Sequence, residues 1–459
     1  MSNFWDFSVW SGFNILAVLL ISLIFSNFLK KTIRVLRVSL IPTSVLAGLI
    51  LLVISSVYQA ITGKVMFNTA FFGGDGMAEM EVITYHALAL GFIATTLKNS
   101  NNTTSGQRSI EIFNTGVTTV ATYLLQAVVG FAITIGLSYI IKDFFPAAGV
   151  LLPFGYGQGT GQALNYGSIY EAEYGFIGGK SFGLTVAALG FLSASIGGVI
   201  HLNILKKKGK IVVQDECENT PDVAFQDKNE IAINGSLDKL TVQLALIAIA
   251  YFAAYLLMYV LGSLLPGMRS VIYGFNFLLG VLTATLLKAI IRFLEKKKIA
   301  KKQYTNNFLL DRVGNACFDV MVVAGIAAIR LDLLKQYWWI LLLIGVVGLV
   351  ITYFYVRFAS YKLFPAYKDE QFLAMYGMLT GTASTGIILL REIDGEFKTP
   401  VADNLVYQNF PAIVFGFPLM FLATLAPKQP ILTWLILFVF FIVMNVILFR
   451  AQIFKKKEK

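Results

Sequence analysis

Long apolar runs dominate the pattern of hydrophobic and polar positions along this chain. A run of about 20 residues is long enough for an α-helix to cross the hydrocarbon core of a bilayer. The pattern predicts five such helices in each half of the chain and one more near its end. Their approximate bounds are 8–28, 38–60, 81–98, 115–141 and 181–204; then 239–263, 270–293, 313–331, 337–357 and 404–425; and finally 430–450.

Two glycine-rich segments, 147–170 and 371–391, interrupt this pattern. Both contain the sequence Tyr-Gly-x-x-Thr-Gly-x-Ala, which begins at Tyr156 in the first and at Tyr376 in the second. Glycine readily adopts backbone conformations that break a helix. We therefore expect each segment to form a re-entrant hairpin between the fourth and fifth spans of its half.

Clusters of Lys and Arg predict the orientation of the spans, because basic residues are enriched in cytoplasmic loops. The first cluster, 30–37, follows the first span and places the N-terminus outside. Alternation of the spans then brings the loop with Lys98 and Arg108 to the inside, together with the basic clusters at 206–210, 292–302, 357–368 and 455–459. Five spans per half is an odd number, so the two halves have opposite orientations and form inverted repeats.

The predicted fold class is an all-α polytopic membrane protein with two inverted repeats of five transmembrane helices. Each repeat contains a re-entrant hairpin, and one extra C-terminal transmembrane helix follows. Residues 1–205 form the first repeat, 206–237 a polar cytoplasmic linker and 238–425 the second repeat. Residues 426–459 contain the extra helix and a basic cytoplasmic tail.

Composition agrees with a membrane protein: 57% of residues are hydrophobic, 14% are charged, and the mean hydropathy is +0.71. The net charge of +11 comes from clusters beside apolar runs, so a nucleic-acid partner is not expected. The two cysteines and two histidines form no disulfide framework and no ligand-spaced metal motif. We expect neither an enzyme nor a cofactor, apart from Na⁺ as a coupling ion.

The paired hairpins are the candidate substrate site, because matched glycine-broken segments mark the binding sites of transporters. Half-helix N-termini attract anions, and the fork of an arginine fits a carboxylate. The alternative interpretation is that the small residues only allow close helix packing, and that Arg391 is an interfacial anchor. The candidate substrate-binding residues are Gly157, Gln158, Gly159, Thr160, Gly161, Gln162, Asn165, Gly381, Thr382, Ser384, Thr385 and Arg391.

Asn315 and Asp319 lie one helical turn apart in the span near 313–331, so they share a face. An ionisable group inside a membrane segment is by default a functional candidate, and this face could bind Na⁺ or a proton. A structural pairing of Asp319 with another buried polar group is the alternative. The remaining candidate ion-binding residues are the hydroxyl-bearing Thr95, Thr96 and Thr380.

The chain resembles the bacterial sodium/glutamate symporter family over roughly residues 1–425. In that family the first hairpin carries a Gly-His-Gly-Thr-Gly run, and here Gln158 stands in place of the histidine. The second hairpin follows the family's Gly-rich Ala-Thr-Pro-Thr pattern loosely. The stretches that carry the resemblance are 41–49, 91–97, 157–161, 182–184 and 313–315.

The resemblance implies a dimeric, elevator-type secondary transporter of the bacterial cytoplasmic membrane that couples glutamate uptake to Na⁺. The hairpin tips and the spans near 81–98 and 313–331 are then expected to form the mobile transport unit. Alternatives within transport are another carboxylate or amino acid, H⁺ coupling, or export. An ion channel is the alternative from another class, since Gly155-Tyr156-Gly157 is similar to part of a potassium-channel filter.

Overall fold

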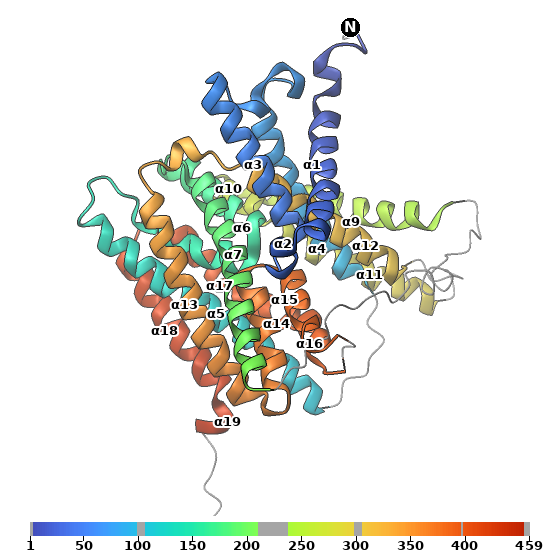
Figure 1. Cartoon of the computed structure of the whole chain (residues 1–459). Helices are drawn as coiled ribbons and strands as arrows, with labels where there is room; N and C mark the ends of the chain where they lie inside the picture. Colours follow the sequence, from blue (N-terminus) through green and yellow to red (C-terminus); the bar gives the residue numbers. More distant parts are fainter. Residues whose placement is uncertain (1–2, 99–105, 210–236, 298–304, 396–397, 454–459) are drawn as a thin grey trace, which may run out of the picture. The chain divides into compact units, whose positions relative to one another are not determined.

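The computed structural model describes residues 3–98, 106–209, 237–297, 305–395 and 398–453. Throughout these ranges the chain forms α-helices and short 3₁₀ turns and contains no strand, which confirms the all-α prediction (Figure 1). The predicted linker 206–237 lies almost entirely outside the described residues.

The first half contains six long helices. They are α1 (Phe7–Thr32), α3 (Thr43–Thr62), α4 (Gly76–Leu97), α5 (Gly106–Ser138), α6 (Leu151–Tyr174) and α7 (Gly179–Lys207). Short elements connect them: α2 (Arg34–Val38), η1 (Met66–Asn68), η2 (Ala70–Phe72) and η3 (Pro146–Val150).

The second half begins with α9 (Lys239–Leu264), η4 (Pro266–Met268), α10 (Arg269–Gly274), α11 (Asn276–Lys296) and α12 (Asn307–Ala327). It continues with η5 (Leu331–Leu334), α13 (Trp338–Leu363), η6 (Pro365–Tyr367), α14 (Lys368–Thr380) and α15 (Ala383–Arg391). The last elements are α16 (Val401–Tyr407), α17 (Asn409–Leu425), α18 (Pro430–Leu448) and α19 (Arg450–Ile453).

Among the described residues, nine helices are long and apolar enough to cross a membrane. They correspond to nine of the predicted spans, so the chain is a multi-pass membrane protein. The other two predictions fall on α12, which carries Asp311, Arg312 and Asp319, and on α17, whose apolar part is short. The span predicted at 270–293 begins later, at Asn276, because the residues before it form the separate helix α10.

The chain divides into two compact units. One comprises residues 1–84, 103–204 and 320–459 and holds both glycine-rich segments; we call it the hairpin unit. The other comprises residues 85–102 and 205–319, and we call it the α9–α11 unit. Each unit draws on both halves of the sequence. The repeat boundaries predicted above stay a prediction, since a repeat need not form a compact unit by itself.

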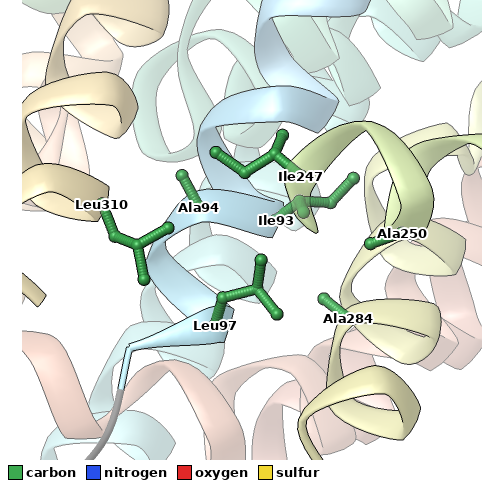
Figure 2. Packing of buried hydrophobic residues seen from close by; sticks show 7 residues of the cluster. All are labelled: Ile93, Ala94, Leu97, Ile247, Ala250, Ala284 and Leu310. Carbon is green, nitrogen blue, oxygen red and sulfur yellow. The ribbon is translucent and has the colours of Figure 1, made fainter. Parts of the chain in front are cut away.

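The core of the α9–α11 unit forms where the end of α4 packs against α9, α11 and the start of α12 (Figure 2). Small residues bring these helices close together: a Cβ at Gly280 would lie 2.9 Å from Ile93. The Thr283 hydroxyl donates to the Ala250 carbonyl at 2.8 Å. Small side chains and hydroxyl bonds are the usual means of helix association where lipid removes the hydrophobic driving force.

In the hairpin unit, α5 packs against α6, α13, α14, α16, α17 and α18. This 33-residue helix is therefore the central element of the unit. Its hydroxyls at Thr118 and Thr122 donate to carbonyls four residues earlier, which hides polar groups within an otherwise apolar helix. The site described next is built around it.

Candidate functional site

The first glycine-rich segment, α6, is not a straight helix. Gly159 has φ +79° and ψ −170°, a backbone conformation that is essentially restricted to glycine. The rings of Phe154 and Tyr166 stack with their centroids 3.9 Å apart. In a straight helix, residues twelve positions apart would be separated by about 18 Å. The segment therefore folds back at Gly159 and forms a hairpin with two helical legs.

The second leg of this hairpin is held by its neighbours on both sides. A Cβ at Gly167 would lie 2.4 Å from the Gly179 carbonyl oxygen, so only glycine allows the leg to approach the start of α7. On another side, the Tyr170 hydroxyl donates to the Ala423 carbonyl of α17 at 2.7 Å. These contacts fix the leg between α7 and α17.

The second glycine-rich segment is broken between α14 and α15. Gly381 and Thr382 have non-helical backbone angles, and the Thr382 side chain accepts a hydrogen bond from the Thr385 N–H. A threonine in this position caps the helix that follows, because it satisfies an N–H group that lacks an intrahelical partner. The break therefore includes the residue that caps the N-terminus of α15.

The two legs of this second hairpin lie side by side (Figure 1). A Cβ at Gly377 would lie 2.8 Å from the Gly386 Cα, and a Cβ at Gly386 would lie 2.3 Å from the Ala374 carbonyl oxygen. The glycines thus allow backbone-to-backbone packing of α14 on α15. Both glycine-rich segments fold back on themselves, as their composition indicated.

The breaks of the two hairpins meet. A Cβ at Gly159 would lie 3.6 Å from Cγ2 of Thr382, which is ordinary van der Waals contact. The tyrosines of the shared motif also converge on one residue of α7: the Tyr156 hydroxyl lies 2.9 Å from Ser193 Oγ, and the Tyr376 hydroxyl donates to the Ser193 carbonyl at 2.9 Å. The hairpins and α7 therefore form one site.

Polar side chains of the first hairpin lie just after its break. Thr160 is buried and donates to the Met321 carbonyl at 3.3 Å. Gln162 is only 1% exposed, and neither atom of its amide has a hydrogen-bond partner among the described residues. Asn165 is buried and does have a partner. An unpaired buried polar group costs about 1–3 kcal/mol, so the Gln162 amide stays a candidate for contact with a ligand.

The backbone at the first break offers two kinds of group. The second leg starts with buried Thr160, Gly161 and Gln162, and the first N–H groups of a helix lack intrahelical partners and attract an anion. Gly157, which is buried, and Gln158, which is half-buried, end the first leg, where carbonyl groups suit a cation. Donors for a carboxylate thus lie beside acceptors for an ion.

The hydroxyls of the second hairpin are arranged around its break. Thr380 is buried and donates to the Tyr376 carbonyl at 2.7 Å. The hydroxyls of Thr382 and Thr385 lie 3.3 Å apart, while Ser384 is exposed. The structure therefore brings the candidates of both hairpins together, with the exposed side of the site at the start of α15.

Arg391 is not brought to the breaks. It is the last residue of α15 and is exposed, and its side chain has an interaction of its own. The eight residues that separate it from Ala383 place it about 12 Å along the helix from the break. The guanidinium of Arg391 could reach a carboxylate bound at the break only if the hairpin rearranged.

The other candidate ion-binding residues belong to the α9–α11 unit. The hydroxyls of Thr95 and Thr96 both donate to the Phe92 carbonyl, while Asn315 and Asp319 are exposed on α12. The Lys288 ammonium donates to the Thr96 carbonyl at 3.1 Å. That carbonyl already contacts a cation, which disfavours Na⁺ at the same oxygen.

Sequence reasoning missed the polar residues of α5. Thr115, Thr119, Thr122 and Gln126 are all buried, although they lie in a long apolar run. Their spacing of three or four residues, which places them on one face of a helix, is the signal that could have found them. This face points into the unit and not to lipid.

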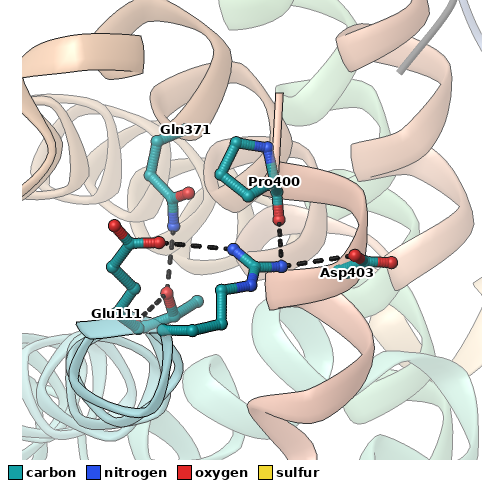
Figure 3. A network of polar contacts seen from close by, with 6 residues as sticks. Glu111, Gln371, Pro400 and Asp403 are labelled. Carbon is teal, nitrogen blue, oxygen red and sulfur yellow. Dashed lines mark hydrogen bonds and ion pairs between the residues drawn. The ribbon is translucent and has the colours of Figure 1, made fainter. Parts of the chain in front are cut away.

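A charged network lies at the start of α5 (Figure 3). The Arg108 guanidinium lies 3.3 Å from a carboxylate oxygen of Glu111 and 3.3 Å from one of Asp403. One turn further along, Gln371 of α14 donates to the Thr115 hydroxyl at 3.3 Å. The network joins α5 to the beginning of the second hairpin and to α16.

The apolar helices make the chain a multi-pass membrane protein, and two broken helices that meet inside such a bundle are typical of secondary transporters. The family model for the sodium/glutamate symporter matches residues 10–398, which include both hairpins. The chain belongs to the sodium/glutamate symporter family, a family of transporters, and the resemblance drawn from the sequence is confirmed. A search of curated proteins found no match.

Proposed function

We propose that the protein imports glutamate, or a similar small carboxylate, by symport with Na⁺. The observation that carries the proposal is the buried amide of Gln162, which has no hydrogen-bond partner among the described residues and lies three residues after the break at Gly159. Family membership supports the symport class. The choice of glutamate rests on the family and on the donors at the site.

The substrate carboxylate is proposed to bind at the N-terminus of the second leg of the first hairpin. There the backbone N–H groups of Gly161 and Gln162 and the Gln162 amide would donate to it, with Thr160 beside them. Thr382, Ser384 and Thr385 would supply hydroxyls from the opposite break. Such preformed donors bind an anion without a positively charged side chain.

Na⁺ is proposed to bind at the Thr380 hydroxyl, where the first leg of the second hairpin ends, and Gly157 and Gln158 are proposed to line the substrate site. Carbonyl groups at broken helix ends coordinate Na⁺ in transporters of this kind. An anion and a cation held close together in a site of low dielectric stabilise each other. Each therefore raises the affinity for the other, which is the thermodynamic basis of coupling. Thr95, Thr96, Asn315 and Asp319 are proposed as a separate ion site that uses their side-chain oxygens and not the Thr96 carbonyl, which accepts from Lys288.

Alternating access by an elevator-type movement, a homodimeric assembly and a location in the bacterial cytoplasmic membrane are further parts of the proposal. The basic clusters support an N-terminus outside and a C-terminus in the cytoplasm. The nine apolar helices support a lipid environment.

The test is uptake of labelled glutamate into proteoliposomes, with and without an inward Na⁺ gradient. We expect saturable uptake that requires Na⁺, and we expect the double variant Thr160→Ala/Thr380→Ala to lose it. Thr84→Ala is the matched control: Thr84 is also buried and donates to a carbonyl of its own helix, but lies outside both hairpins. It should retain uptake.

If glutamate is not transported but another carboxylate acts as an inhibitor, the proposed substrate is wrong and the assignment as a carrier stands. Ion leak without accumulation of any solute would overturn the carrier in favour of a channel.

A further inference from the structure

Two side chains of α5 reach the two hairpins from positions one helical turn apart. The Tyr123 hydroxyl donates to the Gly157 carbonyl of the first hairpin at 2.9 Å, and the Gln126 amide donates to the Leu379 carbonyl of the second at 3.0 Å. We propose that Tyr123 and Gln126 are positioning residues that set the spacing of the two breaks. The inference deepens the proposed function, because it rests on the breaks being the binding site.

The two carbonyls occupy equivalent places. Gly157 precedes the break at Gly159 by two residues, and Leu379 precedes Gly381 by two residues. Carbonyls in the last turn of a helix lack regular intrahelical partners, and in a membrane protein such groups must be satisfied by other parts of the chain. The α5 donors supply partners at the two points where the backbone leaves the helical path.

Both donors are in close contact with their surroundings. A Cβ at Gly157 would lie 2.0 Å from the Tyr123 ring, so the ring rests directly on the hairpin backbone. Gln126 is fully buried, and its amide also donates to the Thr352 hydroxyl of α13 at 2.9 Å. Gln126 therefore cannot follow a moving second hairpin without giving up its hydrogen bond to α13.

A single helix therefore determines how far apart the breaks lie. Residues 123 and 126 are separated by a rise of about 4.5 Å along α5, and the breaks they hold are in contact through Gly159 and Thr382. The site is thus shaped before the substrate arrives. Loss of one donor should lower the fraction of molecules with a competent site, which raises the apparent Kd and KM by the same factor.

The experiment compares backbone hydrogen exchange in the full-length protein in lipid nanodiscs, without substrate. Tyr123→Phe removes only the hydroxyl, and Gln126→Met removes only the polar groups at similar length. We expect Tyr123→Phe to speed exchange about tenfold in a peptide covering 151–166, and Gln126→Met to do so in one covering 371–386, as expected for loss of one hydrogen bond. Each variant should leave the other hairpin unchanged.

Thr122→Val is the matched control, since Thr122 is buried on the same helix but bonds the Thr118 carbonyl of α5 itself. It should change neither peptide. Uptake measurements supply a second readout: both variants should raise KM and leave kcat nearly unchanged, whereas a merely structural defect would lower the amount of active carrier and leave KM as it is.

Unchanged exchange in both peptides, or the same increase with Thr122→Val, would overturn the inference. Selective exchange in a protein that does not transport glutamate would refute the proposed substrate and still support the positioning role. If Gln126→Met does not fold, Thr352→Val takes its place: it frees the Gln126 amide from α13, and exchange should rise in 371–386 alone. No increase there would count against the inference.

Discussion

Both hairpins interrupt a helix and reverse the direction of the chain, but the structures of their breaks differ. The first turns at a single residue, Gly159, whose positive φ only glycine tolerates well, and its legs are buried along most of their length. The second breaks over two residues with negative φ, and a threonine side chain restarts the helix; Ala383 and Ser384, just beyond the break, are exposed.

This difference shows where each hairpin is vulnerable. The first depends on the backbone conformation of Gly159 and on the stacking of Phe154 and Tyr166 within a buried environment. The second depends on a hydrogen-bonded cap next to two exposed residues, Ala383 and Ser384.

The largest effect is expected at Gly159. Its substitution Gly159→Ala places a side chain on a backbone conformation that costs about 1–3 kcal/mol, although space is available because the nearest atom would be 3.6 Å away. We expect the initial rate of uptake into proteoliposomes to fall by tenfold or more, together with a lower Tm in detergent.

Gly175→Ala is the control for Gly159→Ala. Gly175 also has a positive φ, +71°, and open space around it, but it follows the hairpin at the end of α6. This variant should lose stability and keep the wild-type KM. Equal loss of uptake in both variants would show that the backbone conformation of Gly159 has no particular role in transport.

A smaller effect is expected from Thr382→Ala, which removes the cap of α15. Loss of a threonine cap typically costs about 1 kcal/mol, so the second hairpin should open more often. We expect KM to rise about fivefold, since 1.4 kcal/mol corresponds to tenfold, and the Tm to fall slightly.

The control for the cap is Asp238→Ala. Asp238 caps α9 by accepting from the N–H groups of Leu240 and Thr241, far from the hairpins in sequence. A similar loss of Tm with an unchanged KM is expected. A raised KM in this variant too would mean that cap loss acts on transport through stability alone.

The smallest effect concerns the loop after the second hairpin. Burial alone would raise the pKa of Asp394, but hydrogen bonds from the Thr399 hydroxyl and from the backbone N–H groups of Lys398 and Thr399 outweigh it and lower that pKa. A carboxylate with a lowered pKa in the folded state adds stability above its unfolded pKa, and this is lost as the pH falls through the folded value.

The ordinary pKa of this group is 3.8, so thermal unfolding should show the loss only below about pH 4. Asp394→Asn should lower the Tm at neutral pH by a few degrees at most and remove this part of the acid dependence. If the Tm of Asp394→Asn falls with pH in the same way as that of the wild type, other carboxyl groups cause this dependence.

Much of the architecture was predictable, because it depends on local physical chemistry. Runs of apolar residues have to be helical to satisfy their backbone in a membrane, and nine of the predicted spans are confirmed. The glycines of 147–170 and 371–391 marked both helix breaks. The predicted ends differ where polar residues enter an apolar run, as in α12, or where a short separate helix comes first, as in α10.

The candidate site was predictable in part. Thr160, Gln162 and Thr382 do gather at the breaks, since they lie within the broken segments themselves. Arg391 also lies in such a segment, but the helix carries it to the far end of α15. Asp319 belongs to the other unit and is exposed.

By itself, the sequence determined which segments are helical, which are broken and which family the chain belongs to, because periodicity, glycine content and motifs are local properties. Only the tertiary structure decided that Gly159 meets Thr382, that Tyr156 and Tyr376 share Ser193, and that α5 holds both hairpins. These contacts join residues distant along the chain. No local pattern encodes them, because they depend on how whole helices pack.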